Sequence, residues 1–78
     1  MTDQQNTDLR GRRLLIAEDE YMIALDLAEF FEDAGAEVIG PVGSVKDALA
    51  LIVREGARLG GALLDVNLHN EKIYWSAP

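Results

Sequence analysis

Carboxylates are the residues of this chain best placed to do chemistry, because they follow directly on two short apolar runs. Residues 14–17 run into Glu18, Asp19 and Glu20, and residues 62–64 run into Asp65, with Asn67 two positions later. If the two runs are neighbouring parallel strands, their carboxyl ends lie side by side and the carboxylates converge. Grouped carboxylates repel one another unless a cation joins them. The pattern therefore predicts a divalent metal site beside a reactive aspartate.

Magnesium is the ion that these donors suit. Mg²⁺ takes oxygen ligands, retains several waters and needs only one or two carboxylates from a protein. We expect Asp19 and Asp65 to ligate it directly and Glu18 to act through a water. The backbone carbonyl of Asn67 could add a neutral oxygen. With the charge neutralised, Asp65 could attack a phosphoryl donor, and it is a better nucleophile than Asp19, which is held among acidic neighbours.

Both clusters also have a purely structural interpretation. Residues 18–20 could be acidic residues at a helix N-terminus, where negative charge is favourable. Asp65 could cap a helix or form a turn after its strand. Spacing alone leaves these alternatives open.

Length and composition limit the chain to one small domain. It has 78 residues, a formal net charge of −7 and no cysteine. An acidic domain without a basic stripe is a poor nucleic-acid binder. No run reaches transmembrane length and the lack of cysteine fits a reducing compartment, so we expect a cytoplasmic protein with no membrane partner. Residues 1–11 have almost no apolar content, which predicts a flexible tail before a domain over residues 12–78.

Hydrophobic periodicity predicts the order strand, helix, strand, helix, strand. The strands are expected at residues 12–17, 36–42 and 62–65. The first helix, over residues 21–34, should end at Gly35 and bury one face, made by Ile23, Leu27, Phe30, Phe31 and Ala34. A capping box at Ser44 and Asp47 should open the second helix and Gly56 should close it. Its expected buried residues are Val45, Ala48, Leu49 and Ile52.

Two consecutive βαβ units imply a parallel sheet with right-handed crossovers. Placing the first strand between the other two gives the order 2-1-3, an incomplete doubly wound, flavodoxin-like α/β sheet with two full helices. Pro41 cannot donate to a ladder, so the second strand is expected at a sheet edge. Ligands bind such sheets at the carboxyl ends of the strands where the order reverses. Those ends carry Glu18, Asp19 and Asp65.

The same residues resemble those of a known family. The stretches LLIAEDE (residues 14–20) and ALLDVNL (62–68), with GPVGSV (40–45), are similar to the receiver domain of bacterial two-component response regulators. The resemblance implies that Asp65 is the phosphoacceptor and that Glu18 and Asp19 are the acidic metal pair. It also implies that Asn67 lends its main-chain oxygen to Mg²⁺. The phosphoryl donor would be a histidine kinase or a histidine phosphotransfer protein, and the module would signal rather than act as an enzyme.

The chain departs from the family pattern after Asp65. The family has five β/α units, and its hydroxyl residue at the end of the fourth strand and lysine at the end of the fifth have no counterpart here, because Ser76 and Lys72 do not match those positions. We therefore expect a receiver domain truncated after its third strand, with residues 71–75 at most one turn of a third helix. The third strand would be an exposed edge and would favour a homodimer through it.

Two other interpretations follow from this departure. The chain could be a phosphorylation-incompetent half-receiver that acts as a dimerisation or protein-interaction module. It could also be a fragment with no separate role.

Overall fold

The computed structural model describes residues 9–65 and 73–76, which form four strands and two α-helices. In chain order the elements are β1 (Arg13–Glu18), α1 (Tyr21–Asp33), β2 (Glu37–Val42), α2 (Val45–Glu55), a 3₁₀ turn (Gly56–Arg58), β3 (Gly61–Asp65) and β4 (Ile73–Ser76). Among these residues no helix is long and apolar enough to cross a bilayer.

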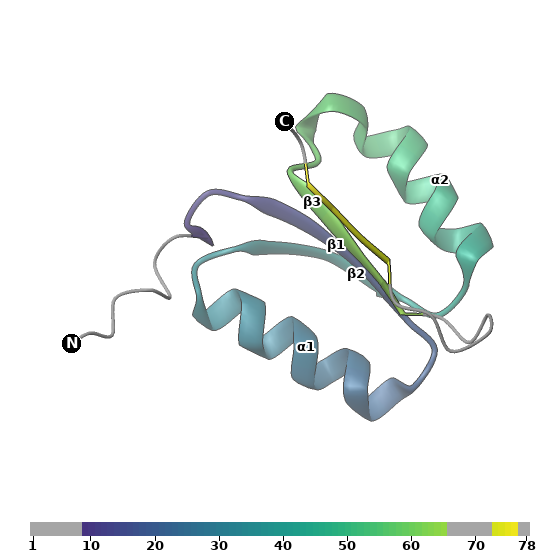
Figure 1. Ribbon diagram of the computed structural model, residues 1–78, viewed down its shortest axis with the longest axis horizontal. Coiled ribbons are helices and arrows are strands. Elements are labelled where there is room, and N and C mark those ends of the chain that lie inside the picture. Colours follow the sequence, from purple (N-terminus) through teal and green to yellow (C-terminus); the bar gives the residue numbers. More distant parts are fainter. Residues whose placement is uncertain (1–8, 66–72, 77–78) are drawn as a thin grey trace.

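The strands form one sheet in the order β2-β1-β3-β4, in which β1 runs parallel to both β2 and β3. This confirms the predicted α/β fold with the order 2-1-3. It also confirms that the strand containing Pro41, β2, lies at an edge. The two helices lie on opposite faces of the sheet, with α1 below it and α2 above it in Figure 1.

The centre of the sheet is β1, which is buried on both faces. Leu15, Ile16 and Ala17 are fully buried, as expected for an apolar strand between two helical layers. On the α2 face the core consists of Leu15, Ala17, Ile39, Ala48, Leu59 and Ala62. The strand is therefore held rigidly up to the acidic residue at its end.

Helix α1 packs through small residues. Its buried side chains are Ala24 and Ala28, whereas Ile23 and Phe30, which we expected on the buried face, are exposed. Alanines allow the helix axis to lie close to the sheet, so bulky neighbours at the sides of that narrow face remain outside. The helix ends where predicted, because Gly35 has φ +102° and a Cβ there would lie 2.7 Å from Arg10 Cγ.

Helix α2 begins with the predicted cap, since Ser44 Oγ accepts the Asp47 N–H at 3.1 Å. Ala48 is buried as expected, but Val45 and Leu49 are 42% and 56% exposed, so their predicted burial is wrong. The reason is the position of α2, which packs mainly on β1 and β2. Its other apolar flank meets no second helix among the described residues.

Strand β4 corrects the prediction for the C-terminal stretch. Residues 73–75 belong to a strand rather than to a helical turn, and β4 pairs antiparallel with β3, with Leu64 opposite Ile73 and Leu63 opposite Tyr74. Aromatic and β-branched residues favour strands, and an unpaired strand edge offers them a ready ladder. The predicted exposed edge of β3 is therefore wrong. The predicted homodimer was argued from that exposed edge. The homodimer itself stays a prediction, because the structure describes a single chain.

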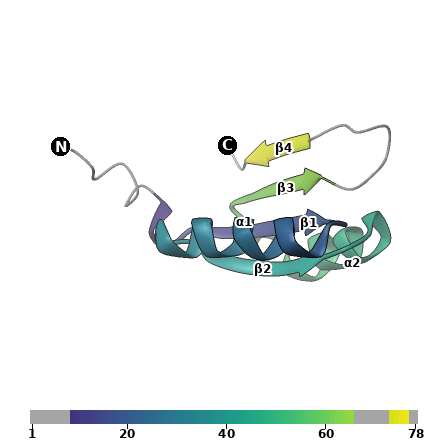
Figure 2. The same ribbon diagram turned by 90° about the horizontal axis from the view of Figure 1, so that it is seen from below.

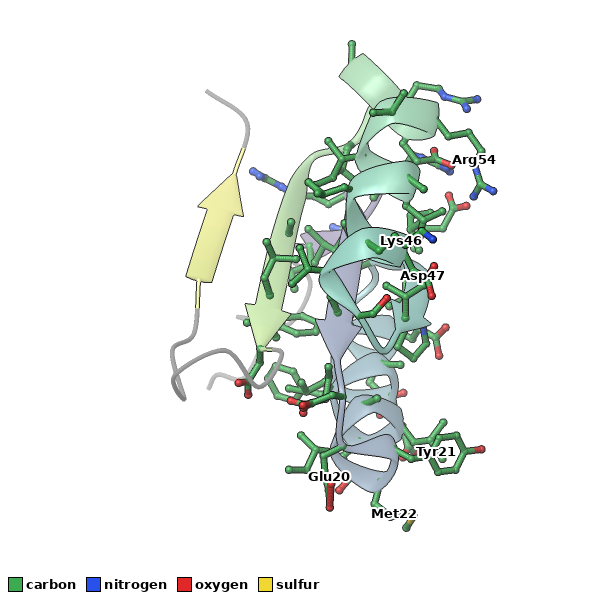
Figure 3. All side chains as sticks on the ribbon, turned by 90° about the vertical axis from the view of Figure 1, so that its right-hand side faces the viewer. Glu20, Tyr21, Met22, Lys46, Asp47 and Arg54 are labelled. Atoms are coloured by element: carbon green, nitrogen blue, oxygen red, sulfur yellow. The ribbon has the colours of Figure 1, made fainter. Side chains whose placement is uncertain are left out.

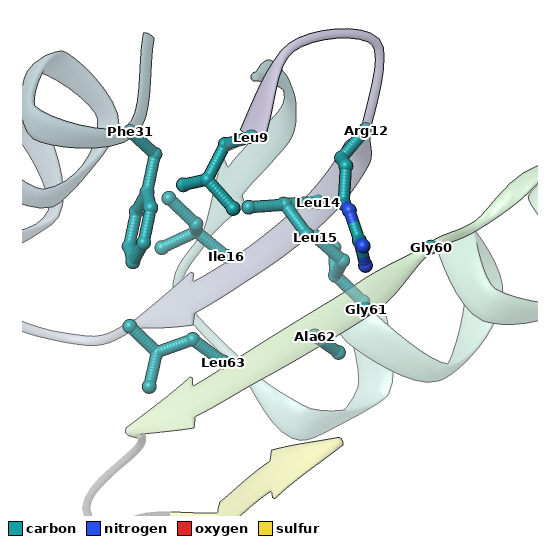
Figure 4. Close-up of a pocket in the computed structure, with 10 residues that line it drawn as sticks. All are labelled: Leu9, Arg12, Leu14, Leu15, Ile16, Phe31, Gly60, Gly61, Ala62 and Leu63. Carbon is teal, nitrogen blue, oxygen red and sulfur yellow. The ribbon is translucent and has the colours of Figure 1, made fainter. Parts of the chain in front are cut away.

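The two helices cover the β3 side of the sheet less than the β2 side. Both helices pack mainly on β1 and β2, and Figure 2 shows β3 and β4 standing apart from them. A hollow of about 270 Å³ lies on the α1 face, with Phe31, Ile16 and Leu63 in its wall (Figure 4). A second hollow, of about 260 Å³, lies between the end of α2 and β3.

Residues 9–11, which we assigned to the tail, contact the domain. Gly11 N–H donates to the Gly35 carbonyl at 3.4 Å, and Leu9 lines the hollow on the α1 face. The boundary at residue 12 stays a prediction.

Candidate functional site

The two acidic strand ends lie next to each other. In the parallel ladder between β1 and β3, Glu18 is the direct register partner of Asp65. Side chains at paired positions of parallel strands project from the same face of a sheet. The fold thus brings together the ends of two strands that are separated by 46 intervening residues in the sequence, and it does so at the carboxyl edge of the sheet, beside the start of α1 (Figure 3).

Glu18 is the most enclosed member of this group. It is only 5% exposed, although it is a carboxylate. One oxygen, Oε2, accepts the backbone N–H of Glu20 at 2.9 Å. The other, Oε1, is buried without a hydrogen-bond partner among the described residues. An ionised oxygen left in this state is costly, so the group favours an added proton or cation.

The electrostatics around Glu18 point the same way. Burial raises the pKa of its carboxyl above the ordinary 4.5, and the neighbouring carboxylates of Asp65 and Asp19 raise the pKa further. The N–H of Glu20 lowers it and only partly offsets these effects. Negative charge therefore accumulates around Glu18 at this edge of the sheet.

The other predicted site residues differ in how far the structure describes them. Asp65 is half-buried at the end of β3, and Asp19 is exposed just after β1. Asn67 lies outside the described residues. Within residues 9–65 and 73–76, no three acidic, imidazole or thiol side chains are grouped as a ready-made metal site.

The donor set nevertheless suits a hard cation. Glu18 Oε1 is a buried carboxylate oxygen that no described residue hydrogen-bonds, and carboxylates are the ligands that Mg²⁺ prefers. Mg²⁺ usually keeps several waters and needs only one or two protein carboxylates, so a cluster of three is not required.

A second buried carboxylate, which the sequence did not reveal, lies at the opposite end of β1. Glu55, at the end of α2, is 6% exposed, and its Oε1 accepts from Arg13 at 2.5 Å. Arg13 also contacts Glu37 at 2.6 Å. The hydrogen bond from Arg13 above all, helped by Arg54 and Arg58, lowers the pKa of Glu55 below its ordinary 4.5. The only sequence signal was an arginine at the start of a strand otherwise buried, which needs an acidic partner nearby.

Comparison with known proteins gives a partial match. Over 40 residues the chain is 48% identical to the transcriptional regulatory protein PdtaR of Mycobacterium tuberculosis, in two strains. The match covers 51% of this chain, which spans about 20% of the length of that relative. No family model matches the chain, and no solved structure gives a significant match. The similarity agrees with a receiver-like domain and extends no further than a general connection with two-component signalling.

Proposed function

We propose that this chain is a phosphoacceptor module of two-component signalling, in which Asp65 receives a phosphoryl group with the help of Mg²⁺. The observation that carries the proposal is the direct pairing of Glu18 with Asp65 at the carboxyl ends of β1 and β3, where Glu18 Oε1 is buried and has no hydrogen-bond partner within the described part of the chain. The partial match to a transcriptional regulatory protein supports a regulatory role.

Each acidic residue has a distinct part in this proposal. A carboxylate oxygen of Asp65 attacks the phosphorus of a phosphohistidine; the new P–O bond forms, the P–N bond breaks, and the departing imidazole takes up a proton. Asp19 and Asp65 would hold Mg²⁺ directly, Glu18 through a water, and the carbonyl of Asn67 would complete the protein's donors. When bound, Mg²⁺ supplies positive charge to the phosphoryl oxygens. The donor would be a histidine kinase or a histidine phosphotransfer protein.

The enclosed position of Glu18 explains why it suits the indirect role. Its Oε2 is already committed to the Glu20 amide, which fixes the orientation of the carboxylate. Asp65 is more accessible, as a nucleophile must be.

A phosphorylation-incompetent interaction module is the second candidate function. It is favoured by the large apolar side chains that the described surface exposes, including Tyr21, Met22, Phe30, Leu49 and Val53. A chain that works only by binding would need neither Mg²⁺ nor an unmodified Asp65.

Incubation with Mg²⁺ and a small acyl phosphate separates the two functions. We expect the intact protein to gain the mass of one phosphoryl group, in an acid-stable but base- and hydroxylamine-labile linkage typical of an acyl phosphate. Asp65→Asn should abolish the gain, because an amide is not a nucleophile. Asp47→Asn, at an exposed carboxylate at the start of α2, is the matched control and should be modified normally.

The outcome that contradicts the proposal is also specific. Modification that persists in Asp65→Asn, or that proceeds equally well in a chelator, would exclude Asp65 or Mg²⁺ from the reaction. No modification of a folded wild-type chain would leave the interaction module as the better account.

A further inference from the structure

One flank of α2, adjoining its buried face, is apolar and lacks a covering element among the described residues. Val45, Leu49 and Val53 follow one another at intervals of four, so they form one stripe along the helix. They are 42%, 56% and 83% exposed, and Val53 has the largest exposed fraction of the bulky apolar residues described. We call these three residues the α2 stripe. At 1.5 Å per residue it extends over about 12 Å.

The α2 stripe is continuous with the hollow beside β3. Ile52 and Gly56 line that hollow and follow Leu49 by three and seven positions, so they adjoin the stripe on the helix surface. The remainder of the lining is apolar too: Leu59, Ala62 and Leu64. Helix and strand thus form the wall and the floor of a single apolar groove, which is unusual for an exposed surface.

Three of the four charged residues of α2 lie on its other side, and the fourth, Glu55, is bound by Arg13. Figure 3 shows Lys46, Asp47 and Arg54 projecting from the side turned away from β3 and β4. Covering the groove would therefore not require a charge to be buried.

We propose that a second copy of this chain covers the groove, in a two-fold symmetric dimer built on antiparallel α2 helices. About the two-fold axis Leu49 meets its own counterpart, and Val45 of each copy meets Val53 of the other. Each Val53 then extends towards the hollow beside the partner's β3. This dimer differs from one formed through a strand edge, because it uses a helix flank and leaves the sheet edges unpaired.

Charge selects this face for self-association. The chain carries a net charge of −7, so most of its surface repels a second copy. The segment 45–58 is an exception, with three cations, Lys46, Arg54 and Arg58, against Asp47 and Glu55. By contrast, α1 has four acidic residues and no basic one, Asp26, Glu29, Glu32 and Asp33. An antiparallel pair of α2 helices also places each helix N-terminus beside the partner's C-terminus, which is favourable.

The size of the groove sets the expected strength. A standard interface buries about 800 Å² per partner. One stripe about 12 Å long with its adjoining hollow covers less than that, so the dimer should be weak and form at micromolar concentration or above.

Single cysteines give the most direct test, because the chain has no cysteine of its own. Under a mild oxidant, Leu49→Cys should give disulfide-linked dimers, since the two positions face each other at the axis. Val53→Cys alone should not, because its two copies lie about 12 Å apart along the helices, beyond disulfide reach. Val45→Cys mixed with Val53→Cys should give the mixed dimer. Met22→Cys, an exposed position on α1, is the control for random collision.

Sedimentation equilibrium supplies an independent reading. Val53→Lys should weaken dimerisation about tenfold or more, because it removes an apolar contact and places two like charges in the interface. Its circular dichroism should be unchanged, since Val53 is 83% exposed. Met22→Lys, the matched control, should dimerise like the wild type.

Three results would each overturn the proposal. The first is a wild-type chain that remains monomeric at concentrations on the order of hundreds of micromolar. The second is a dimer unaffected by Val53→Lys. The third is cross-linking of Leu49→Cys no faster than that of Met22→Cys, or cross-linking of Val53→Cys alone as fast as that of Leu49→Cys, which would mean parallel helices.

Discussion

Strand β1 has a buried carboxylate near each end, and the two carboxylates have opposite electrostatic surroundings. Near its start, Glu55 is bound by Arg13 at 2.5 Å and further contacted by Arg54 and Arg58. At its other end, Glu18 has one oxygen on a backbone N–H and the other without a partner in the described chain. Their exposures are nearly equal, 6% and 5%, so burial alone does not separate them.

The electrostatic difference between these carboxylates indicates which one serves only to stabilise the fold. Cations lower the pKa of Glu55, whereas burial and neighbouring carboxylates raise the pKa of Glu18. The buried carboxylate of Glu55 has a cation on each oxygen, Arg13 on Oε1 and Arg54 on Oε2, so its charge is neutralised within the described chain. A buried charge surrounded by like charges is incomplete, and it lies where open α/β sheets bind their ligands. We interpret the Arg13 end as a clamp between α2 and the sheet, and the Glu18 end is the cation site that we propose.

Removal of Arg13 should have the largest effect on stability. In Arg13→Met the carboxylate of Glu55 stays buried but loses its closest cation, so we expect a large fall in the free energy of unfolding. Urea denaturation followed by circular dichroism measures it. Arg54→Met is the matched control: Arg54 contacts the same carboxylate at 3.3 Å, but its side chain is 67% exposed, so little stability should be lost. Equal losses in the two variants would refute the idea of a clamp.

The second-largest effect should be on the pH dependence of stability, which tests whether Glu55 contributes through its charge. Because the pKa of Glu55 is lowered, its contribution is present above the unfolded value of 4.5 and is lost as pH falls through the lower folded value. The difference in unfolding free energy between the wild type and Glu55→Gln should therefore be full at neutral pH and shrink below about pH 4.5. A difference that is constant across this range would show that Glu55 acts through packing alone.

Glu18→Gln should have a smaller effect on stability than Arg13→Met, and it should stabilise the protein rather than destabilise it. The raised pKa means that folding favours the protonated carboxyl, so the contribution of Glu18 is present below pH 4.5 and is lost as pH rises through its folded pKa. In a chelator at neutral pH, Glu18→Gln should therefore be more stable than the wild type. With Mg²⁺ present the difference in stability between the two proteins should shrink or change sign, since the cation stabilises the wild type more than the variant. Thermal melts with and without Mg²⁺ test both expectations, and a variant less stable than the wild type in chelator would contradict them.

The contrast between the two ends of β1 also marks what the sequence could predict. The acidic end was predictable because βαβ connections make the strands parallel, and placing the first strand between the other two brings Glu18 beside Asp65. The clamp was not, because nothing in local pattern links Arg13 with Glu55, 42 positions apart. Its geometry depends on where α2 ends over the sheet.

Two further differences have similar causes. The burial of Val45 and Leu49 was overestimated because helical periodicity locates an apolar face without stating whether anything covers it. The sequence of β4 wrongly predicts a helical turn, because a short apolar stretch has no reliable period and the pairing with β3 decides its conformation. Short-range pattern was sufficient at Ser44 and Gly35, where capping and backbone conformation are local.

A Mg²⁺ titration followed by carboxyl-carbon NMR tests the central claim most directly, because it observes both ends of β1 in one sample. We predict saturable shifts of the Glu18 and Asp65 resonances, no change at Glu55, and loss of the Glu18 shift in Asp65→Asn. Shifts of Glu55 equal to those of Glu18, or no shift of Glu18 and Asp65 at millimolar Mg²⁺, would contradict the account.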